Sequence, residues 1–293
     1  MIFFKKLLEK TIIKETVKFI NGVPENLEIV NTGSTFALHG FDYNYFDRKG
    51  FNFALSPQPL SYDYKILQQY KKNISTGAIV AIVVCLFGFC VEYYDNDETN
   101  YKYYYFLDKT NINGYTKLKD FLIKHGFIIF KPKFIIFALK SIIKKIIKRG
   151  EGISEKNIEI TANAQIAGWK KEFNLTDVKK CEPSEKLIEV FKKTRFILGK
   201  MIDLCLENKF KPVIINMPAC VEESSEFSEE FINKFYRENI EFVNIYKIPF
   251  INYFRDKRFH DHSLYINANC LNDKGRKYFA EILTEDLKKL NMW

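Results

Sequence analysis

Ser34 is the residue of this chain whose type and setting best suit covalent chemistry. An apolar run (27–30) leads into a predicted tight turn at Gly33, and the hydroxyl side chains Ser34 and Thr35 follow where a helix is predicted to begin. A strand, a glycine-bearing turn and a helix start lift such a side chain clear of a sheet and place backbone N–H groups beside it. A serine that only caps an ordinary strand-to-helix turn gives the same pattern. The pattern therefore nominates Ser34 as a nucleophile that needs a proton acceptor from elsewhere.

Candidate proton acceptors for Ser34 lie near the end of the chain. His260 and His262 flank Asp261. A serine hydroxyl is a weak nucleophile until a neighbour takes its proton, and imidazole does so near neutral pH. Either histidine would serve if its loop folds back over Ser34; otherwise each is a solvated loop side chain.

Five apolar segments are predicted to be strands, at 27–32, 51–55, 78–86, 211–218 and 248–253. Longer helices are predicted at 62–72, 184–208, 228–238 and 273–290. On the short helix after Ser34, His39 is expected to point away from the serine and to pack. Strands and helices that alternate at this spacing favour right-handed crossovers and a parallel sheet, whose ligands gather at the carboxyl ends of the strands. The predicted fold is a three-layer α/β sandwich with a five-stranded parallel sheet.

Residues 92–183 break this alternation and are predicted to form an inserted cap or lid. The expected α/β domain is therefore built in two parts, 1–91 and 184–293, around the insertion. Within the insertion, 134–149 (FIIFALKSIIKKIIKR) carries Lys and Arg at helical spacing opposite Phe and Ile. We favour a helix whose apolar face packs on the body of the protein. The alternative is an interfacial helix that lies on an anionic membrane.

The composition describes a globular protein and shows no export signal. Hydrophobic residues make up 47% and charged residues 28% of the 293 residues, outside the range of disordered chains. The N-terminal 20 residues alternate apolar and charged side chains, and the longest apolar run (78–91) is too short to span a bilayer. The six cysteines form no C-x-x-C pair and are expected to be reduced thiols. We expect a cytoplasmic protein, with a peripheral position at the inner face of the membrane as the alternative.

Several classes of ligand are not supported by the sequence. The glycine-rich nucleotide motifs and the H-E-x-x-H zinc motif are absent, and His260 with His262 alone makes a poor metal site. The net charge of +9 would suit a phosphate-bearing or membrane partner, but the lysines are spread over many segments. We expect no metal, no cofactor and no nucleic-acid partner.

The order of a serine turn near the start and a base before the last helix resembles the SGNH (GDSL-type) hydrolases and acyltransferases. The likeness is closest to the branch that modifies bacterial surface polysaccharides and teichoic acids. The matching stretches are 31–42, 50–67, 211–218 and 263–279, so the resemblance covers both ends of the chain but not the insertion. It implies a flavodoxin-like sheet and ester chemistry in which Ser34 attacks an acyl carbonyl.

The chain departs from the family pattern where the family places its other catalytic groups. SLYINANCLNDKGRKYFAEIL matches the family at Leu271-Asn272 and Gly275, but the catalytic His position falls on Cys270 and the orienting Asp position on Asn267. After the third strand, where the family often has an oxyanion-binding Asn, the chain has Cys85 and no Asn. An Asn side chain cannot stabilise a developing imidazolium as an Asp does.

The resemblance and the residues together give one candidate site and three hypotheses. The candidate catalytic residues are Ser34, Cys270, Asn267, His262 and His260, and those for substrate or oxyanion binding are Thr35, Ser56, Gln58 and Cys85. First, the protein is an O-acyl (acetyl) esterase or acyltransferase with a substitute base, whose partners are an acyl donor and a bacterial cell-surface glycan. Second, it keeps the fold without the chemistry and binds a glycan, a lipid-linked precursor or a partner protein. Third, Cys270 is itself a nucleophile, which needs a lowered thiol pKa and a nearby base.

Overall fold

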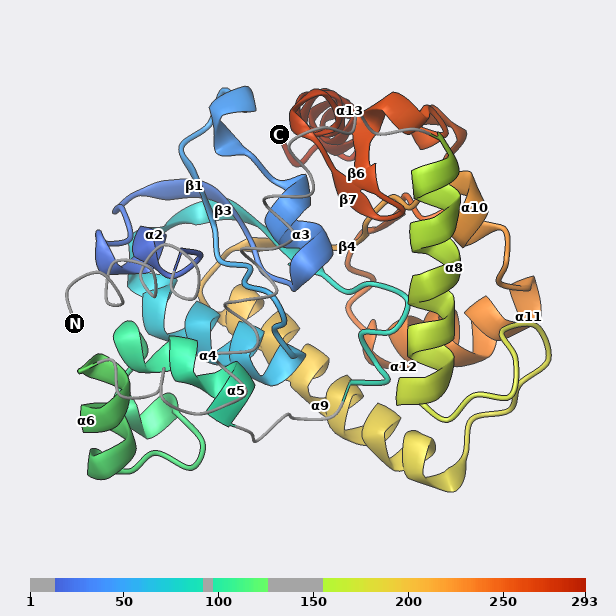
Figure 1. Cartoon of the computed structure of the whole chain (residues 1–293). Helices are drawn as coiled ribbons and strands as arrows, with labels where there is room; N and C mark the ends of the chain where they lie inside the picture. Colours follow the sequence, from blue (N-terminus) through green and yellow to red (C-terminus); the bar gives the residue numbers. More distant parts are fainter. Residues whose placement is uncertain (1–13, 92–96, 126–154) are drawn as a thin grey trace. The chain divides into compact units, whose positions relative to one another are not determined.

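The computed structural model describes residues 14–91, 97–125 and 155–293 (Figure 1). The chain divides into two compact units, one made of 1–23 and 94–152 and the other of 24–93 and 153–293. The segment 134–149 and most of the N-terminal 20 residues lie outside the described residues. The predicted insertion at 92–183 stays a prediction, and its residues fall partly in each unit.

The described part of the smaller unit consists of short helices around aromatic side chains. They include α2 (Val17–Ile20), α5 (Asp97–Asn100) and α6 (Lys117–Lys124). Phe19 stacks on Phe106 with 4.1 Å between ring centroids, and the Tyr105 hydroxyl donates to the carbonyl of Ile123 at 3.1 Å. None of the candidate site residues belongs to this unit.

The larger unit is built on a five-stranded parallel sheet. The strands are β1 (Leu27–Asn31), β2 (Gly50–Asn52), β3 (Ile74–Val83), β4 (Lys211–Asn216) and β5 (Phe250–Asn252). Their order is β2-β1-β3-β4-β5, and every neighbouring pair is parallel. This is the flavodoxin-like order, so the predicted fold class is confirmed. Each strand overlaps the segment predicted for it.

The sheet is centred on β3, which pairs with both β1 and β4. Its residues 78–83 are all buried and include no charged side chain. A strand covered on both faces needs apolar side chains on both faces, so the continuous apolar run replaces the usual alternation. The same run marks the centre of the hydrophobic core.

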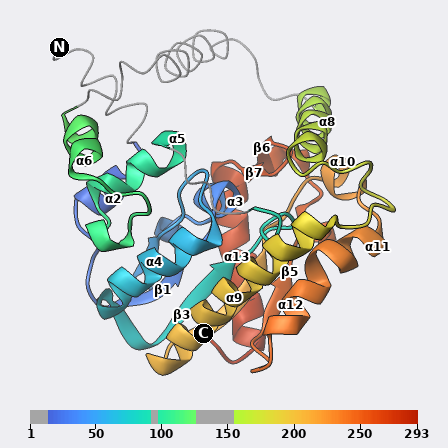
Figure 2. The same cartoon turned by 90° about the horizontal axis from the view of Figure 1, so that it is seen from below.

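Helices cover both faces of the sheet. On one face, α3 (Thr35–Gly40) packs against α13 (Asp273–Lys289), and on the other α9 (Glu185–Glu207) lies between α4 (Leu60–Tyr70) and α12 (Glu238–Val243) (Figure 2). Ser184 begins α9 by accepting the N–H of Leu187 at 3.3 Å. The predicted helices 184–208 and 273–290 are therefore confirmed within two residues at each end.

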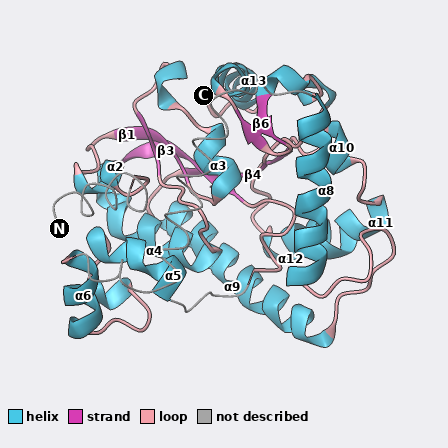
Figure 3. Cartoon of the chain, viewed as in Figure 1, coloured by secondary structure: helices cyan, strands magenta, loops and turns pink. Residues whose placement is uncertain are grey.

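Several elements of the larger unit were not predicted. They are α8 (Glu155–Glu172), α10 (Val221–Ser224) and an antiparallel hairpin of β6 (Tyr265–Asn267) and β7 (Cys270–Leu271). The region predicted as one helix over 228–238 is α11 (Glu229–Ile232) followed by a π-helical turn and α12. α8 packs against β6 and α10 (Figure 3), so one stretch of the predicted insertion covers the hairpin.

Gly33 should be indispensable to the turn after β1. Its φ is +121°, and a Cβ there would lie 2.8 Å from the Cβ of Ala37 and 2.9 Å from that of Val83. We expect Gly33→Ala to lower the free energy of unfolding by about 2–4 kcal/mol, because both the backbone conformation and the space exclude a side chain. Urea unfolding followed by circular dichroism measures this.

The matched control is Gly199→Ala in α9, where no atom lies within 4 Å of the added Cβ. Because alanine favours a helix more than glycine does, this change should raise the free energy of unfolding by about 0.5–1 kcal/mol. Equal unfolding midpoints for Gly33→Ala and the unmodified protein would show that the turn tolerates a side chain.

Candidate functional site

The candidate site lies at the carboxyl edge of the sheet. Ser34 follows β1, Gln58 follows β2, Cys85 follows β3 and Cys220 follows β4, and in a parallel sheet these strand ends share one edge. The β6–β7 hairpin joins the same edge, because the N–H of Cys220 donates to the carbonyl of Ala268 at 2.8 Å and β7 packs against α3. Two parts of the chain more than 200 residues apart thus meet there (Figure 1).

Gln58 and Asp63 hold the turn that carries Ser34. The N–H of Gln58 donates to Ser34 Oγ at 2.9 Å, and its side-chain amide donates to the carbonyl of Gly33 at 3.1 Å. The buried Asp63 carboxylate accepts the N–H of Gly33 at 2.6 Å and the Gln58 amide at 2.7 Å. The turn after β1 and the loop after β2 are therefore joined by hydrogen bonds.

Four of the candidate residues lie on this turn and this loop. Ser34 contacts Gln58 as described, and the hydroxyls of Thr35 and Ser56 lie 2.6 Å apart. Ser34 occupies the position before the first residue of α3, yet its side chain does not cap the helix. The alternative in which Ser34 serves as an ordinary cap is therefore not what the structure shows.

No proton acceptor contacts Ser34 in the part of the chain that the structure describes. The hydrogen bond from the Gln58 N–H is the one interaction that Ser34 Oγ makes there. That bond uses one lone pair of the oxygen, and no side chain among the described residues accepts the hydroxyl proton in a hydrogen bond. Without such an acceptor, a serine has the nucleophilicity of an ordinary alcohol.

Cys270 and Asn267, at the family's base and orienting positions, serve the hairpin. Cys270 is 4% exposed, and burial raises the pKa of its thiol to about 11. The Asn267 side chain accepts the N–H groups of Asn269 at 3.1 Å and Cys270 at 2.9 Å, which closes the turn between β6 and β7. A thiol that stays protonated near neutral pH fits neither the role of base nor that of nucleophile.

Cys85 also carries a shielded thiol. Burial is the main cause that raises its pKa to about 12. The position after β3 therefore supplies an apolar sulfur where the family often has a hydrogen-bonding Asn. All six cysteines lie in the described residues, and none forms a disulfide.

His260 and His262 line a cleft. This cleft, of about 720 Å³, is lined by Ile158, His260, Asp261, His262, Ser263, Tyr265 and Asn272, and Ser34 is not among these residues. The Nε2 atom of His262 lies 2.7 Å from Oε1 of Glu222. His39, on α3, is half-buried. The role of either loop histidine as a base for Ser34 stays a prediction.

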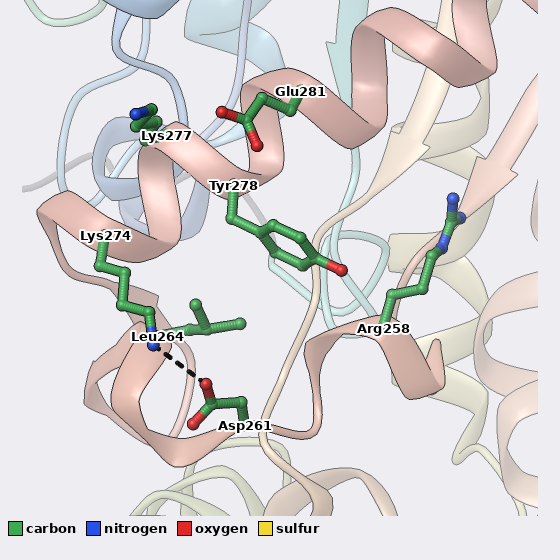
Figure 4. Close-up of a pocket in the computed structure, with 7 residues that line it drawn as sticks. All are labelled: Arg258, Asp261, Leu264, Lys274, Lys277, Tyr278 and Glu281. Carbon is green, nitrogen blue, oxygen red and sulfur yellow. Dashed lines mark hydrogen bonds and ion pairs between the residues drawn. The ribbon is translucent and has the colours of Figure 1, made fainter.

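Asp261 does not orient either histidine as a catalytic carboxylate would. Hydrogen bonds from Ser263 and then from Lys274 lower the pKa of Asp261 to about 2, and Lys274 Nζ lies 3.1 Å from its carboxylate (Figure 4). A neighbouring cleft of about 450 Å³ is lined by Arg258, Asp261, Leu264, Lys274, Lys277, Tyr278 and Glu281. None of the candidate site residues lines it.

Glu223 is a polar residue of this edge that the sequence analysis missed. It is fully buried and accepts a hydrogen bond from the Asn269 amide at 2.9 Å. Its other oxygen, Oε1, has no hydrogen-bond partner among the described residues. Burial raises the pKa of Glu223 to about 8, so the carboxyl is largely protonated at neutral pH.

The same network reaches α8. The side-chain amides of Asn269 and Gln165 hydrogen-bond to each other, and the N–H of Ala268 donates to the Thr161 hydroxyl at 3.1 Å. α8 therefore fixes the hairpin that holds Cys270. In the sequence, Gln165 and Thr161 are ordinary polar residues of a helix. Only their contacts in the structure show that they hold the hairpin.

Metal and membrane features are not seen in the described part of the chain. No cluster of three or more His, Cys, Asp or Glu side chains there has the geometry of a metal site. Among the helices that the structure describes, none combines the length and the apolar character that crossing a bilayer requires.

Several solved structures are similar to the chain, and two of them are described here. No family model and no curated protein sequence matches the chain. An acylhydrolase candidate from Bacteroides fragilis has a TM-score of 0.42 and 10% identity, with 96% of this chain and 97% of that chain covered. A GDSL-like lipase from Bacteroides thetaiotaomicron has a TM-score of 0.42 and 9% identity, with 96% and 98% covered. The activity of this chain is inferred from its own residues.

Glu223 should make the protein less stable as the pH rises. Its pKa increases from 4.5 in the unfolded chain to about 8 in the fold, so the folded state binds more protons than the unfolded state between these values. Stability therefore falls from about pH 5 to pH 8. Glu223→Gln, which stays neutral, should remove this part of the fall. Urea unfolding at several pH values measures it.

The control for that experiment is Glu226→Gln, an exposed neighbour. This variant should keep the pH dependence of the unmodified protein, because an exposed carboxyl is solvated in both states. If Glu223→Gln and the unmodified protein lose stability equally between pH 5 and pH 8, the buried carboxyl does not govern the dependence.

Proposed function

We propose that the protein binds an acylated bacterial cell-surface glycan, or its lipid-linked precursor, at the carboxyl edge around Ser34 without cleaving the ester. The observation that supports the absence of cleavage is the lack of a base at Ser34 Oγ, which among the described residues is hydrogen-bonded to the Gln58 N–H and to no imidazole or carboxylate. The class of ligand comes from the family that the sequence resembles.

The chemistry at the base position explains why the ester would remain intact. A general base contributes about 10²–10⁴-fold to such a reaction, and replacing the orienting Asp by Asn in a serine protease costs about 10⁴-fold. Here Cys270, with a thiol pKa of about 11, stays protonated, and the Asn267 oxygen is occupied by two backbone N–H groups. Neither residue can take the serine proton.

The groups around Ser34 still suit a sugar or an ester. Ser34, Thr35 and Ser56 are partly exposed hydroxyl residues at the edge where ligands of such sheets bind. Hydroxyls donate and accept, as sugar hydroxyls and ester carbonyls require. Such a site would hold the ligand by neutral hydrogen bonds.

Acyl transfer or hydrolysis through Ser34 is the second candidate function. It is favoured by the position of the serine, which lies at the turn after β1 and does not serve as a helix cap. The Gln58 N–H beside it would suit an oxyanion if the serine rotated away. This function requires a general base for Ser34, which none of the contacts described above supplies.

Binding of the proposed ligand class can be measured directly. O-acetylated wall polysaccharide, and the same material after mild alkaline de-O-acetylation, are titrated into the protein by calorimetry. We expect tighter binding of the acetylated form, and about five- to tenfold weaker binding by Thr35→Val, because one neutral hydrogen bond contributes about 1 kcal/mol. Thr110→Val, in the smaller unit, is the control. Equal affinities for both polysaccharides would contradict the proposal.

Absence of acyl chemistry is tested separately with a fluorophosphonate probe and p-nitrophenyl acetate. We expect equal labelling and equal hydrolysis for the unmodified protein and Ser34→Ala, because Ser34 lacks a base. The combined variant Asn267→Asp and Cys270→His carries the residue types of the family at these two positions and shows whether they alone make Ser34 reactive. Labelling of the unmodified protein that disappears in Ser34→Ala would instead establish the second candidate function.

A further inference from the structure

Large hydrophobic side chains are exposed along α9 and α12 of the larger unit. Phe196 of α9 is 65% exposed, Phe242 of α12 is 67% exposed, and Ile245 and Tyr246, just after α12, are 74% and 53% exposed. We call these four residues the aromatic patch. Because α9 and α12 pack against each other (Figure 2), the patch lies on one surface. Apolar side chains gathered in this way commonly mark an interaction site.

Contacts with α9 hold the side chains that α12 and the following loop contribute to the patch. The Arg195 guanidinium lies 4.7 Å from the ring centroid of Phe242. The Tyr246 hydroxyl is hydrogen-bonded to Asp203. These side chains are therefore ordered before any partner arrives, which lowers the entropy cost of association.

The exposed side of α9 carries charges of opposite sign in a definite order. Lys193, Phe196, Lys200, Asp203 and Glu207 follow one another at steps of three and four, so they form a stripe on one side of the helix. All five are exposed or partly exposed. Two lysines flank the phenylalanine, and two acids follow toward the carboxyl end. The stripe therefore has a cationic amino half and an acidic carboxyl half.

The charges beside this stripe are also of both signs. Glu189 pairs with Lys192, and Glu238 of α12 attracts Arg195. Glu241 of α12 is exposed. A surface of this kind does not suit a partner of a single sign, such as a nucleic acid or an anionic membrane. It suits a partner whose own surface carries both signs.

A second copy of the chain carries the complementary order of charges. When two stripes pack antiparallel about a two-fold axis midway between positions 196 and 200, Lys193 of each copy faces Asp203 of the other. In the same register, Phe196 of each copy faces Lys200 of the other. Because a two-fold interface is isologous, every favourable pair occurs twice. Steps of three and four are also the spacing by which helices commonly pack on one another.

We propose that the protein forms a two-fold dimer through α9 and α12. The two α9 helices pack antiparallel, Phe196 and Phe242 of both copies are buried near the axis, and Lys193 of each copy pairs with Asp203 of the other. Aromatic residues and arginine, which this surface supplies, are enriched in protein–protein interfaces. The interface contains none of the candidate residues of the Ser34 edge, so the dimer does not depend on the proposed function.

Light scattering and sedimentation equilibrium with the full chain test the dimer. We expect a mass near twice the 34.7 kDa of one chain. Phe196→Ser with Phe242→Ser should raise the dissociation constant at least about a hundredfold, because each dimer then loses four buried rings. A chain that stays monomeric at about 0.1 mM, where even a weak dimer forms, would overturn the proposal.

Exchange of charges tests the antiparallel register. Lys193→Asp alone and Asp203→Lys alone should each raise the dissociation constant at least about tenfold, because like charges then face each other twice in every dimer. When the two variants are mixed, opposite charges face each other again, and a mixed dimer as tight as the unmodified one should form. A misfolded variant could not produce this recovery, and failure to recover would show the pairing to be wrong.

Leu118→Ser with Phe121→Ser is the matched control, because these side chains are 67% and 51% exposed on α6 of the other unit. This variant should dimerise like the unmodified protein, and circular dichroism should be unchanged in all variants. A dimer that persists after the substitutions at Phe196 and Phe242 but dissociates in the control would place the interface on α6 and contradict the proposal.

Discussion

The carboxylate of Asp63 holds together the first two loops of the sheet's carboxyl edge. Buried beneath the turn, it accepts the N–H of Gly33 and the amide of Gln58, so a charge-assisted bond is made on each side. Gln58 in turn places its own N–H on Ser34 Oγ. The serine's position and its hydrogen-bonded state both follow from this one arrangement. A buried acid that satisfies two donors is strongly constrained, since losing either donor would leave it poorly solvated.

On the other side of the edge, Asn267 and Cys270, which align with catalytic positions of the SGNH pattern, have structural roles. Asn267 closes the hairpin turn through two backbone N–H groups, and Asn269 links the hairpin to Glu223 and to Gln165 of α8. An Asp at position 267 could close the turn equally well, but an imidazole in place of the buried Cys270 side chain would need more space. The polar groups of this region therefore bond mainly to one another, which favours a rigid edge over a reactive one.

The sheet could be predicted because its strands bury both faces. The run 78–83 is apolar at every position and does not alternate with polar residues. In a chain where predicted helices separate such runs, this pattern indicates a strand buried on both faces. α8 could not be predicted in the same way, because its buried apolar residues Ile158, Ala162 and Ile166 are few and its contacts to Asn269 are polar. Glu223 follows another glutamate in an acidic segment, and nothing local shows which of the two is buried. The serine turn was visible in sequence, whereas the bond that occupies Ser34 Oγ depends on a loop 24 residues away.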